Sequence, residues 1–232
     1  MTISEALDAA APEVDRMLSQ QPRVEAAVRH VMGTVYRFLG EPEKALPHLE
    51  RAVALRRREL GEDDPSTLNS LHNLCDVLYA QGQLDAAETL GRQVLECRRK
   101  KPRSEEIGIA RSCALLGLIL TDKGKLPQAE ALLREALGGF IVGLPERHWR
   151  TASVQSSLGC CLMAQGRYAD AEPLLLAACQ ALQDRKVSPR VHMRKTFDHV
   201  VRLYEAWGKK DKAEKWRQDL QRFDLREKAK TK

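Results

Sequence analysis

Apolar residues recur at the spacing of an α-helix along almost the whole chain. In one stretch they are Val154, Leu158, Cys161 and Leu162, and in the next they are Ala171, Leu174, Leu175, Ala178 and Leu182. Steps of three and four residues place such side chains on one face of a helix. The pattern therefore predicts a first helix, a short turn and a second helix in this part of the chain.

The turn between the two predicted helices recurs at a fixed distance. A Gly stands five residues before an Ala at Gly40, Gly82, Gly124, Gly166 and Gly208, and neighbouring copies are 42 residues apart. Gly adopts the left-handed conformation that ends a helix, and Ala fits where two helix axes cross closely. A second small residue stands seven positions before the turn Gly in four of the five units: Gly33, Cys75, Gly117 and Gly159. In the fifth unit the equivalent position is occupied by the larger Val201. The spacing predicts antiparallel helix pairs with a close crossing in each pair.

A single helix pair cannot bury both of its faces, so the pairs are expected to stack into one curved, all-α solenoid. The predicted division is an N-terminal capping helix in residues 1–21, five repeats in residues 22–61, 64–103, 104–143, 147–186 and 189–221, and a basic tail in residues 222–232. Ile3 to Leu18 is interpreted as a lone second helix that caps the stack. Pro22, Pro65 and Pro189 are expected in the first turns of helices, where Pro is tolerated.

Composition supports a helical protein and argues against a membrane-spanning one. The chain is 43% hydrophobic, 30% charged and 5% aromatic, which is typical of a soluble helical fold. No apolar run reaches the roughly 18 residues that a membrane span requires. The N-terminal sequence MTISEALDAAAPEVD is acidic and unlike a signal peptide. A cytoplasmic location is therefore expected.

The positive charge is concentrated at one end of the chain. The net charge is +6, and residues 208–232 hold ten Lys and Arg against five Asp and Glu. Such a tail favours a solvated helix end and argues against nucleic-acid binding. The basic clusters at residues 56–58 and 98–101 are interpreted in the same way, because they suit the negative end of a helix dipole.

Neither a metal nor another cofactor is expected. The six cysteines show no CxxC spacing, and buried thiols behave as small hydrophobic groups. His30 and His72 occupy equivalent positions in successive first helices, and Asp76 lies one turn beyond His72. Two His and one carboxylate can bind a transition metal, but no fourth ligand is evident. The sequence also lacks a Ser/His/Asp order, a carboxylate pair or a phosphate loop that could form an active site.

The repeat resembles the tetratricopeptide family, whose units carry Leu-Gly and Tyr in the first helix and Ala in the second. One unit matches at Gly33, Tyr36, Gly40, Ala45 and Ala52, while the usual first-helix Trp is replaced by Arg29 in that unit. The resemblance implies a right-handed superhelical solenoid. The 42-residue period and linkers such as LGEDDPSTLNSL are similar to the kinesin-light-chain variety of the repeat.

Two further stretches, GRYADAEPLLL and VRLYEAWGKKDKAEKW, resemble the closing repeats found behind bacterial serine/threonine kinases. The chain has no Gly-rich phosphate loop, HRD or DFG motif, so phosphoryl transfer is not expected from it. A regulatory or sensor segment that acts with such a kinase stays open as an alternative function, and so does formation of a homo-oligomer.

The tetratricopeptide resemblance implies a non-enzymatic scaffold that binds a protein or peptide partner on the concave face formed by the first helices. The residues expected there are His30, Thr34, Arg37, Asn69, His72, Asn73, Asp76, Tyr79 and Arg111. Later units offer Ser153, Ser156, Cys160, Lys195, Asp198, Arg202 and Glu205. In kinesin-light-chain relatives paired Asn residues hold a peptide backbone, and Asn73 is the one that remains here. The first two units are therefore the predicted binding site.

Overall fold

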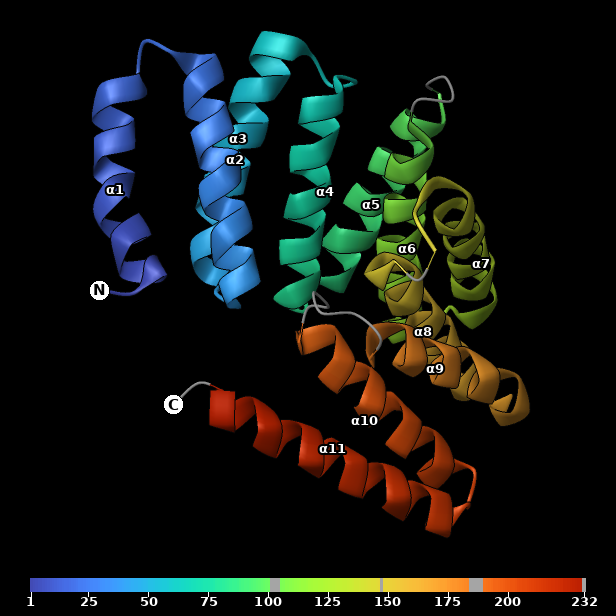
Figure 1. Cartoon of the computed structure of the whole chain (residues 1–232). Helices are drawn as coiled ribbons and strands as arrows, with labels where there is room; N and C mark the ends of the chain where they lie inside the picture. Colours follow the sequence, from blue (N-terminus) through green and yellow to red (C-terminus); the bar gives the residue numbers. More distant parts are fainter. Residues whose placement is uncertain (101–104, 147, 184–189, 231–232) are drawn as a thin grey trace. The chain divides into compact units, whose positions relative to one another are not determined.

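The computed structural model describes residues 1–100, 105–146, 148–183 and 190–230. Within these ranges the chain forms eleven α-helices and divides into two compact units, Met1–Glu105 and Glu106–Lys232 (Figure 1). The first unit contains α1 (Ile3–Leu18), α2 (Pro22–Leu39), α3 (Pro42–Leu60), α4 (Pro65–Ala80) and α5 (Leu84–Arg99). The second contains α6 (Glu106–Asp122), α7 (Leu126–Gly143), α8 (Trp149–Ala164), α9 (Tyr168–Gln183), α10 (Arg190–Ala206) and α11 (Lys210–Lys230). The predicted all-α repeat architecture is confirmed.

Each unit is built from stacked helix pairs. In the first unit α2 packs on α3 and α4 on α5, and α3 packs on α4 to join the two pairs. In the second unit the pairs are α6–α7, α8–α9 and α10–α11, joined by contacts of α7 with α8 and of α9 with α10. The predicted boundary at residues 103 and 104 lies outside the described residues.

The turn glycines have the predicted conformation. Gly40, Gly82, Gly124, Gly166 and Gly208 have φ angles between 72° and 78°, a region in which a side chain would strain the backbone. The Ala five residues later is fully buried in the first four turns, at Ala45, Ala87, Ala129 and Ala171. Each Gly therefore lets the chain reverse within a few residues and places an Ala between the two helices.

The small residue in the first helix sits directly against a Leu of the second. A Cβ atom on Gly33 would lie 2.6 Å from Cγ of Leu49, and one on Gly117 would lie 2.7 Å from Cγ of Leu133. Gly159 faces Leu175 in the same way, at 2.6 Å. In the α4–α5 pair the first-helix residue is Cys75, whose thiol donates to the carbonyl of Ala87 at 3.2 Å. In α5 the position equivalent to Leu49, Leu133 and Leu175 is occupied by the buried Gly91. In this pair the larger side chain is therefore on the first helix and the Gly is on the second.

Helix α1 covers the residues predicted for the N-terminal helix. Its Leu7, Ala11 and Val14 pack on the core formed by Met32, Tyr36, Ala45, Leu49 and Val77. Asp8 accepts hydrogen bonds from Tyr36 at 2.7 Å and from Lys44 at 2.8 Å. Arg29, which replaces the usual Trp, is buried and donates to Asp15 of α1. Polar contacts thus replace part of the apolar packing between α1 and α2.

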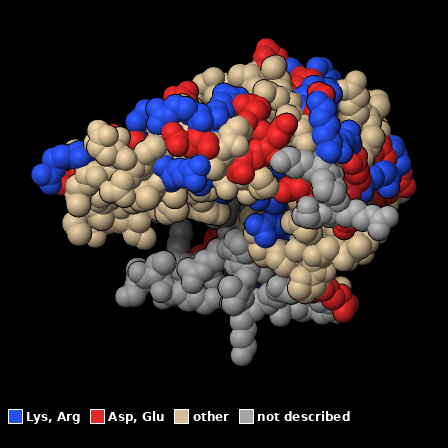
Figure 2. Space-filling model, turned by 90° about the horizontal axis from the view of Figure 1, so that it is seen from above, with Lys and Arg blue, Asp and Glu red and all other residues tan. Residues whose placement is uncertain are grey.

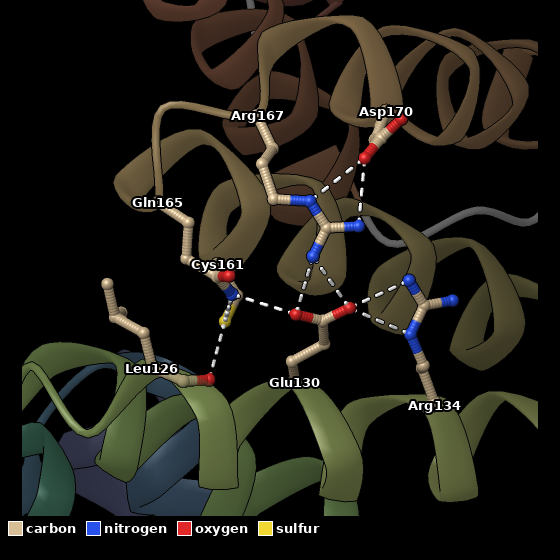
Figure 3. Close-up of polar contacts among 7 residues, drawn as sticks. All are labelled: Leu126, Glu130, Arg134, Cys161, Gln165, Arg167 and Asp170. Carbon is tan, nitrogen blue, oxygen red and sulfur yellow. Dashed lines mark hydrogen bonds and ion pairs between the residues drawn. The ribbon is translucent and has the colours of Figure 1, made fainter.

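A carboxylate links successive pairs in the second unit (Figure 3). Glu130 of α7 accepts from Gln165 at 2.9 Å and from Arg167 at 2.9 Å, both in the α8–α9 turn. Arg134, one turn further along α7, donates to the same carboxylate at 2.8 Å. The hydrogen bonds from Gln165, and then those from Arg134 and Arg167, lower the pKa of Glu130 to about 2. The charged carboxylate therefore fastens one repeat to the turn of the next.

Two of the predicted helix starts lie within the described residues. Pro22 and Pro65 stand in the first turns of α2 and α4, and Asp64 caps α4 by accepting from the backbone N–H of Ser66 at 2.8 Å. The third, at Pro189, lies outside the described residues. No helix within the described ranges is long and apolar enough to cross a membrane.

Candidate functional site

The predicted groove residues of α2 and α4 bind one another across the two helices. Thr34 accepts a hydrogen bond from the Asn73 amide at 2.9 Å, and Arg37 donates to the carboxylate of Asp76. His30 and Ser70 are joined at 3.0 Å between Nδ1 and Oγ. We call these six residues, His30, Thr34, Arg37, Ser70, Asn73 and Asp76, the α2–α4 ladder. It fixes the two first helices of the first unit side by side.

A third helix supports the ladder at one end. Arg56 of α3 donates from Nη1 to Oγ of Ser70 at 2.7 Å and to the carbonyl of Ser66 at 2.7 Å. Ser70 is fully buried, so both partners of its hydroxyl come from the protein. Ser70 therefore connects His30 of α2 with Arg56 of α3.

The other predicted residues of α4 are also partly enclosed. Asn69 accepts from the guanidinium of Arg98 at 2.9 Å, and Arg98 is fully buried. His72 is 9% exposed, and Tyr79 is half-buried. Arg111 belongs to α6 in the second unit and is partly buried. The prediction assigned all of these side chains to a partner, whereas Asn69 has a bond inside its own unit.

The interpretation of the basic clusters through the helix dipole alone is incomplete. The first Arg of each cluster is hydrogen-bonded to α4, and Arg98 is fully buried while Arg56 is half-buried. Burial lowers the pKa of both guanidinium groups relative to an exposed Arg. Since Arg stays charged in proteins, these two side chains are internal cations rather than solvated helix ends.

An apolar stripe lies beside the ladder on α2. Val24, Val31 and Phe38 are spaced seven residues apart, which places them on one face of the helix. Their exposed fractions are 46%, 57% and 72%. The guanidinium carbon of Arg37 lies 4.3 Å from the centroid of the Phe38 ring, so this end of the stripe meets the ladder. We refer to Val24, Val31 and Phe38 as the α2 stripe.

The α2 stripe was not predicted from the sequence. The signal was present, because α2 carries more apolar residues than one buried face accommodates. Met32 and Tyr36 fill the core, and the stripe lies on a different side of the helix. A surplus of apolar residues on a first helix was the feature that could have revealed it.

The corresponding residues of the second unit form a smaller polar group. Oγ of Ser156 and Nδ1 of His199 are 2.8 Å apart, and both residues are buried. Burial raises the pKa of the Cys160 thiol to about 12, which disfavours the reactive thiolate. Glu205 is ion-paired with Arg217 at 2.6 Å. Ser156 and Glu205, like the residues of the α2–α4 ladder, are therefore bonded within their own unit.

The described residues contain no group of three or more His, Cys, Asp or Glu side chains placed to hold a metal ion. His30, considered from the sequence as a metal ligand, is bonded to Ser70 instead. On the face seen in Figure 2, the Lys and Arg side chains of the described residues intermingle with Asp and Glu side chains. Such a surface lacks the single-sign field that a phosphate backbone requires.

Comparison with known sequences identifies the repeat. Tetratricopeptide repeat profiles match residues 24–100 and residues 114–185, which together make up more than half of the chain. The chain belongs to the tetratricopeptide repeat (TPR) family. The helix pairs, the turn glycines and the close crossings described above are therefore those of TPR units.

Individual relatives are distant. The TPR chain is 22% identical to Protein KINESIN LIGHT CHAIN-RELATED 3 of Arabidopsis thaliana over 77% of its length, and it spans only 27% of that relative. Among solved structures it is similar to BtubC (BKLC) from P. vanneervenii, with a TM-score of 0.76, 21% identity and coverage of 98% of this chain and 93% of the other. It is also similar to the Rap protein complexed with competence and sporulation factor, with a TM-score of 0.77 and 18% identity. That match covers 96% of this chain and 59% of the Rap chain. These likenesses establish the fold.

Proposed function

We propose that this TPR chain is a non-enzymatic interaction scaffold, and that the α2–α4 face of its first unit binds a segment of a partner protein. The α2 stripe is the observation that supports this proposal. Exposed apolar side chains on one helix face, next to polar ones, are typical of protein-binding surfaces. Because Val31 and Phe38 are 57% and 72% exposed, covering each would contribute less than the roughly 1.5–3 kcal/mol of complete burial, before the costs of association.

The α2–α4 ladder contributes by holding the surface in place before the partner arrives. A rigid surface loses less conformational entropy on binding, which strengthens the complex without adding a contact. Nδ2 of Asn73 donates a hydrogen bond to Oγ1 of Thr34, so in this proposal Oδ1 of Asn73 accepts an N–H of the partner backbone. In the same proposal the half-buried Tyr79 covers an apolar side chain of the partner.

Arg37 has a double role in the proposal. It is paired with Asp76 and stacked on Phe38, so its replacement would loosen α2 from α4 as well as weaken binding. The Rap protein, which has the same fold, was solved with competence and sporulation factor bound. That complex supports a binding role for this chain and leaves the identity of the partner to experiment.

The test uses peptides selected on the full-length protein from a phage-displayed random library, with affinities measured by calorimetry. We expect Val31→Asp and Phe38→Ala to weaken the selected peptides at least tenfold. Val142→Asp is the matched control, because Val142 is an 82% exposed Val on α7 of the second unit. A loss of affinity in Val142→Asp, together with unchanged binding by Val31→Asp, would move the site away from α2 and refute the proposal.

A further inference from the structure

The ends of three helices enclose a pocket in the first unit. It has a volume of about 180 Å³ and is lined by Arg23, Ala26, Ala27, Arg56, Glu59, Leu60 and Ser66. Ala27 is exposed and lies three residues after Val24 and four before Val31, which places it on the face of the α2 stripe. The pocket therefore adjoins the surface on which we place the partner.

Arg56 is a half-buried cation without an ion-pair partner among the described residues. Its Nη1 donates to the Ser66 carbonyl and the Ser70 hydroxyl, both uncharged acceptors. The carboxylate that acts on it electrostatically is Asp64, which is already engaged in capping α4. A half-buried charge without a counter-ion is less well stabilised than a paired one, and binding of an anion would supply the missing counter-charge.

The other charges of the pocket leave it positive. Nε of Arg23 lies 4.0 Å from the carboxylate of Glu59, and Nε of Arg58 lies 2.9 Å from the same carboxylate. The pocket lining thus contains two guanidinium groups, those of Arg23 and Arg56, and one carboxylate, that of Glu59. The Glu59 carboxylate also forms an ion pair with Arg58, which lies outside the lining. The excess corresponds to one positive charge, which suits a singly charged anion better than a phosphate dianion.

The free edge of Arg56 has the geometry of a carboxylate site. Because Nη1 is used by Ser66 and Ser70, the Nε–H and the neighbouring Nη2–H remain available, and no described residue accepts from them. Two parallel N–H groups of a guanidinium match the two oxygens of a carboxylate. Ala26, Ala27 and Leu60 offer apolar contacts to the methylene groups that carry such a carboxylate.

We propose that the Arg56 pocket binds the carboxylate of a Glu side chain of the partner segment that lies along α2. Arg56 accommodates the two oxygens side-on, Arg23 adds a second positive charge at the mouth, and the Glu methylenes lie against Ala26, Ala27 and Leu60. The identity of the occupant rests on the proposed function above, whereas the preference of the pocket for a carboxylate does not.

The pocket is tested first with small probes. In the full-length protein labelled with ¹⁵N-arginine, N-acetyl-glutamic acid amide is titrated at constant ionic strength, and the Arg56 Nε–H resonance is assigned by its absence in Arg56→Lys. We expect a saturable shift of this resonance, absent with the uncharged N-acetyl-glutamine amide. Arg57→Gln is the control, because Arg57 is paired with Glu62 and its loss should leave the shift unchanged. No saturable shift, an equal shift with the glutamine probe, or a shift with inorganic phosphate alone would each overturn the carboxylate assignment.

A double-mutant cycle then tests the pocket in the complex. For a selected peptide with a Glu, replacement of that Glu by Gln should lower the affinity of the wild-type protein at least fivefold. The same replacement should change the affinity of Arg56→Gln less than twofold. If Val31→Asp abolishes binding but no Glu of the peptide couples to Arg56, the scaffold proposal stands and the pocket assignment fails. If Arg56 couples while Val31→Asp has no effect, the pocket assignment stands and the partner does not lie along the α2 stripe.

Discussion

At the scale of single residues, a buried histidine of the second unit makes stability depend on pH. His199 is 8% exposed and lies 2.8 Å from Oγ of Ser156. Burial, and then the nearby charges of Lys195 and Arg202, lower its pKa to about 4, below the ordinary value of 6.5. The folded protein therefore keeps His199 neutral at a pH at which the unfolded chain protonates it. The free energy of unfolding is therefore not reduced by His199 above its pKa in the unfolded chain. It decreases as the pH falls from that value toward the pKa of His199 in the folded protein.

We therefore expect the second unit to become less stable between pH 6.5 and pH 4. From pH 7.5 to pH 5 the loss attributable to His199 is about 2 kcal/mol, by linkage between the two pKa values. Urea unfolding of the wild type and of His199→Gln at both pH values measures it. The variant should be less sensitive to pH by that amount, and equal pH dependence in the two proteins would show that His199 titrates normally.

The ladder marks the limit of what the sequence could predict at this scale. The 42-residue period placed His30, Thr34 and Arg37 on one face of a first helix, and the structure confirms that they share a face. It could not show that they bind Ser70, Asn73 and Asp76, because those pairings depend on how far one helix is shifted along the next. The pocket at Arg56 was missed for the same reason, since three chain segments meet there.

At the scale of helices, the close crossing is maintained by an exchange of side-chain volume. Three pairs place Gly on the first helix and Leu on the second, at Gly33, Gly117 and Gly159. The α4–α5 pair reverses the sizes, with Cys75 on the first helix and Gly91 on the second. The recurring small residue of the first helices was predicted from the sequence, with Cys75 counted as one more small residue. The compensating Gly91 was visible in the sequence and became meaningful once its facing residue was known.

This exchange predicts a coupling between Gly117 and Leu133. Gly117→Cys alone should cost about 1–3 kcal/mol by overpacking, and Leu133→Gly alone about 3–5 kcal/mol through lost burial and helix propensity. The double variant should be less destabilised than the sum of the two by at least about 1 kcal/mol, measured by urea unfolding.

Gly138→Cys supplies the control for that cycle. A Cβ atom on Gly138 would meet nothing within 4 Å, so this substitution combined with Leu133→Gly should be additive. Equal coupling in both cycles would show that the effect arises from the new thiol and not from the crossing.

At the scale of the whole molecule, the arrangement of contacts determines how a local defect spreads. In repeat proteins each unit contacts its neighbours in sequence, so stability is a sum of local terms. Here α3 joins the first two pairs, while α7 and α9 join the pairs of the second unit. The sequence predicted the repeats from the turn glycines and the 42-residue period, which are local features. It could not predict the division into two compact units, which arises from the distribution of contacts along the chain.

Two equivalent core substitutions test how far a defect spreads. Leu49 and Leu175 are fully buried, and each faces the Gly of its own crossing. Replacement of either by Ala should cost about 2–5 kcal/mol. Because opening is local in a repeat array, Leu49→Ala should raise amide hydrogen exchange most in α1–α4, and Leu175→Ala most in α8–α10. Exchange followed by mass spectrometry in both variants measures this. If both substitutions raise exchange in the same helices to the same extent, the chain unfolds cooperatively as a whole. Its stability is then not a sum of contributions from individual repeats.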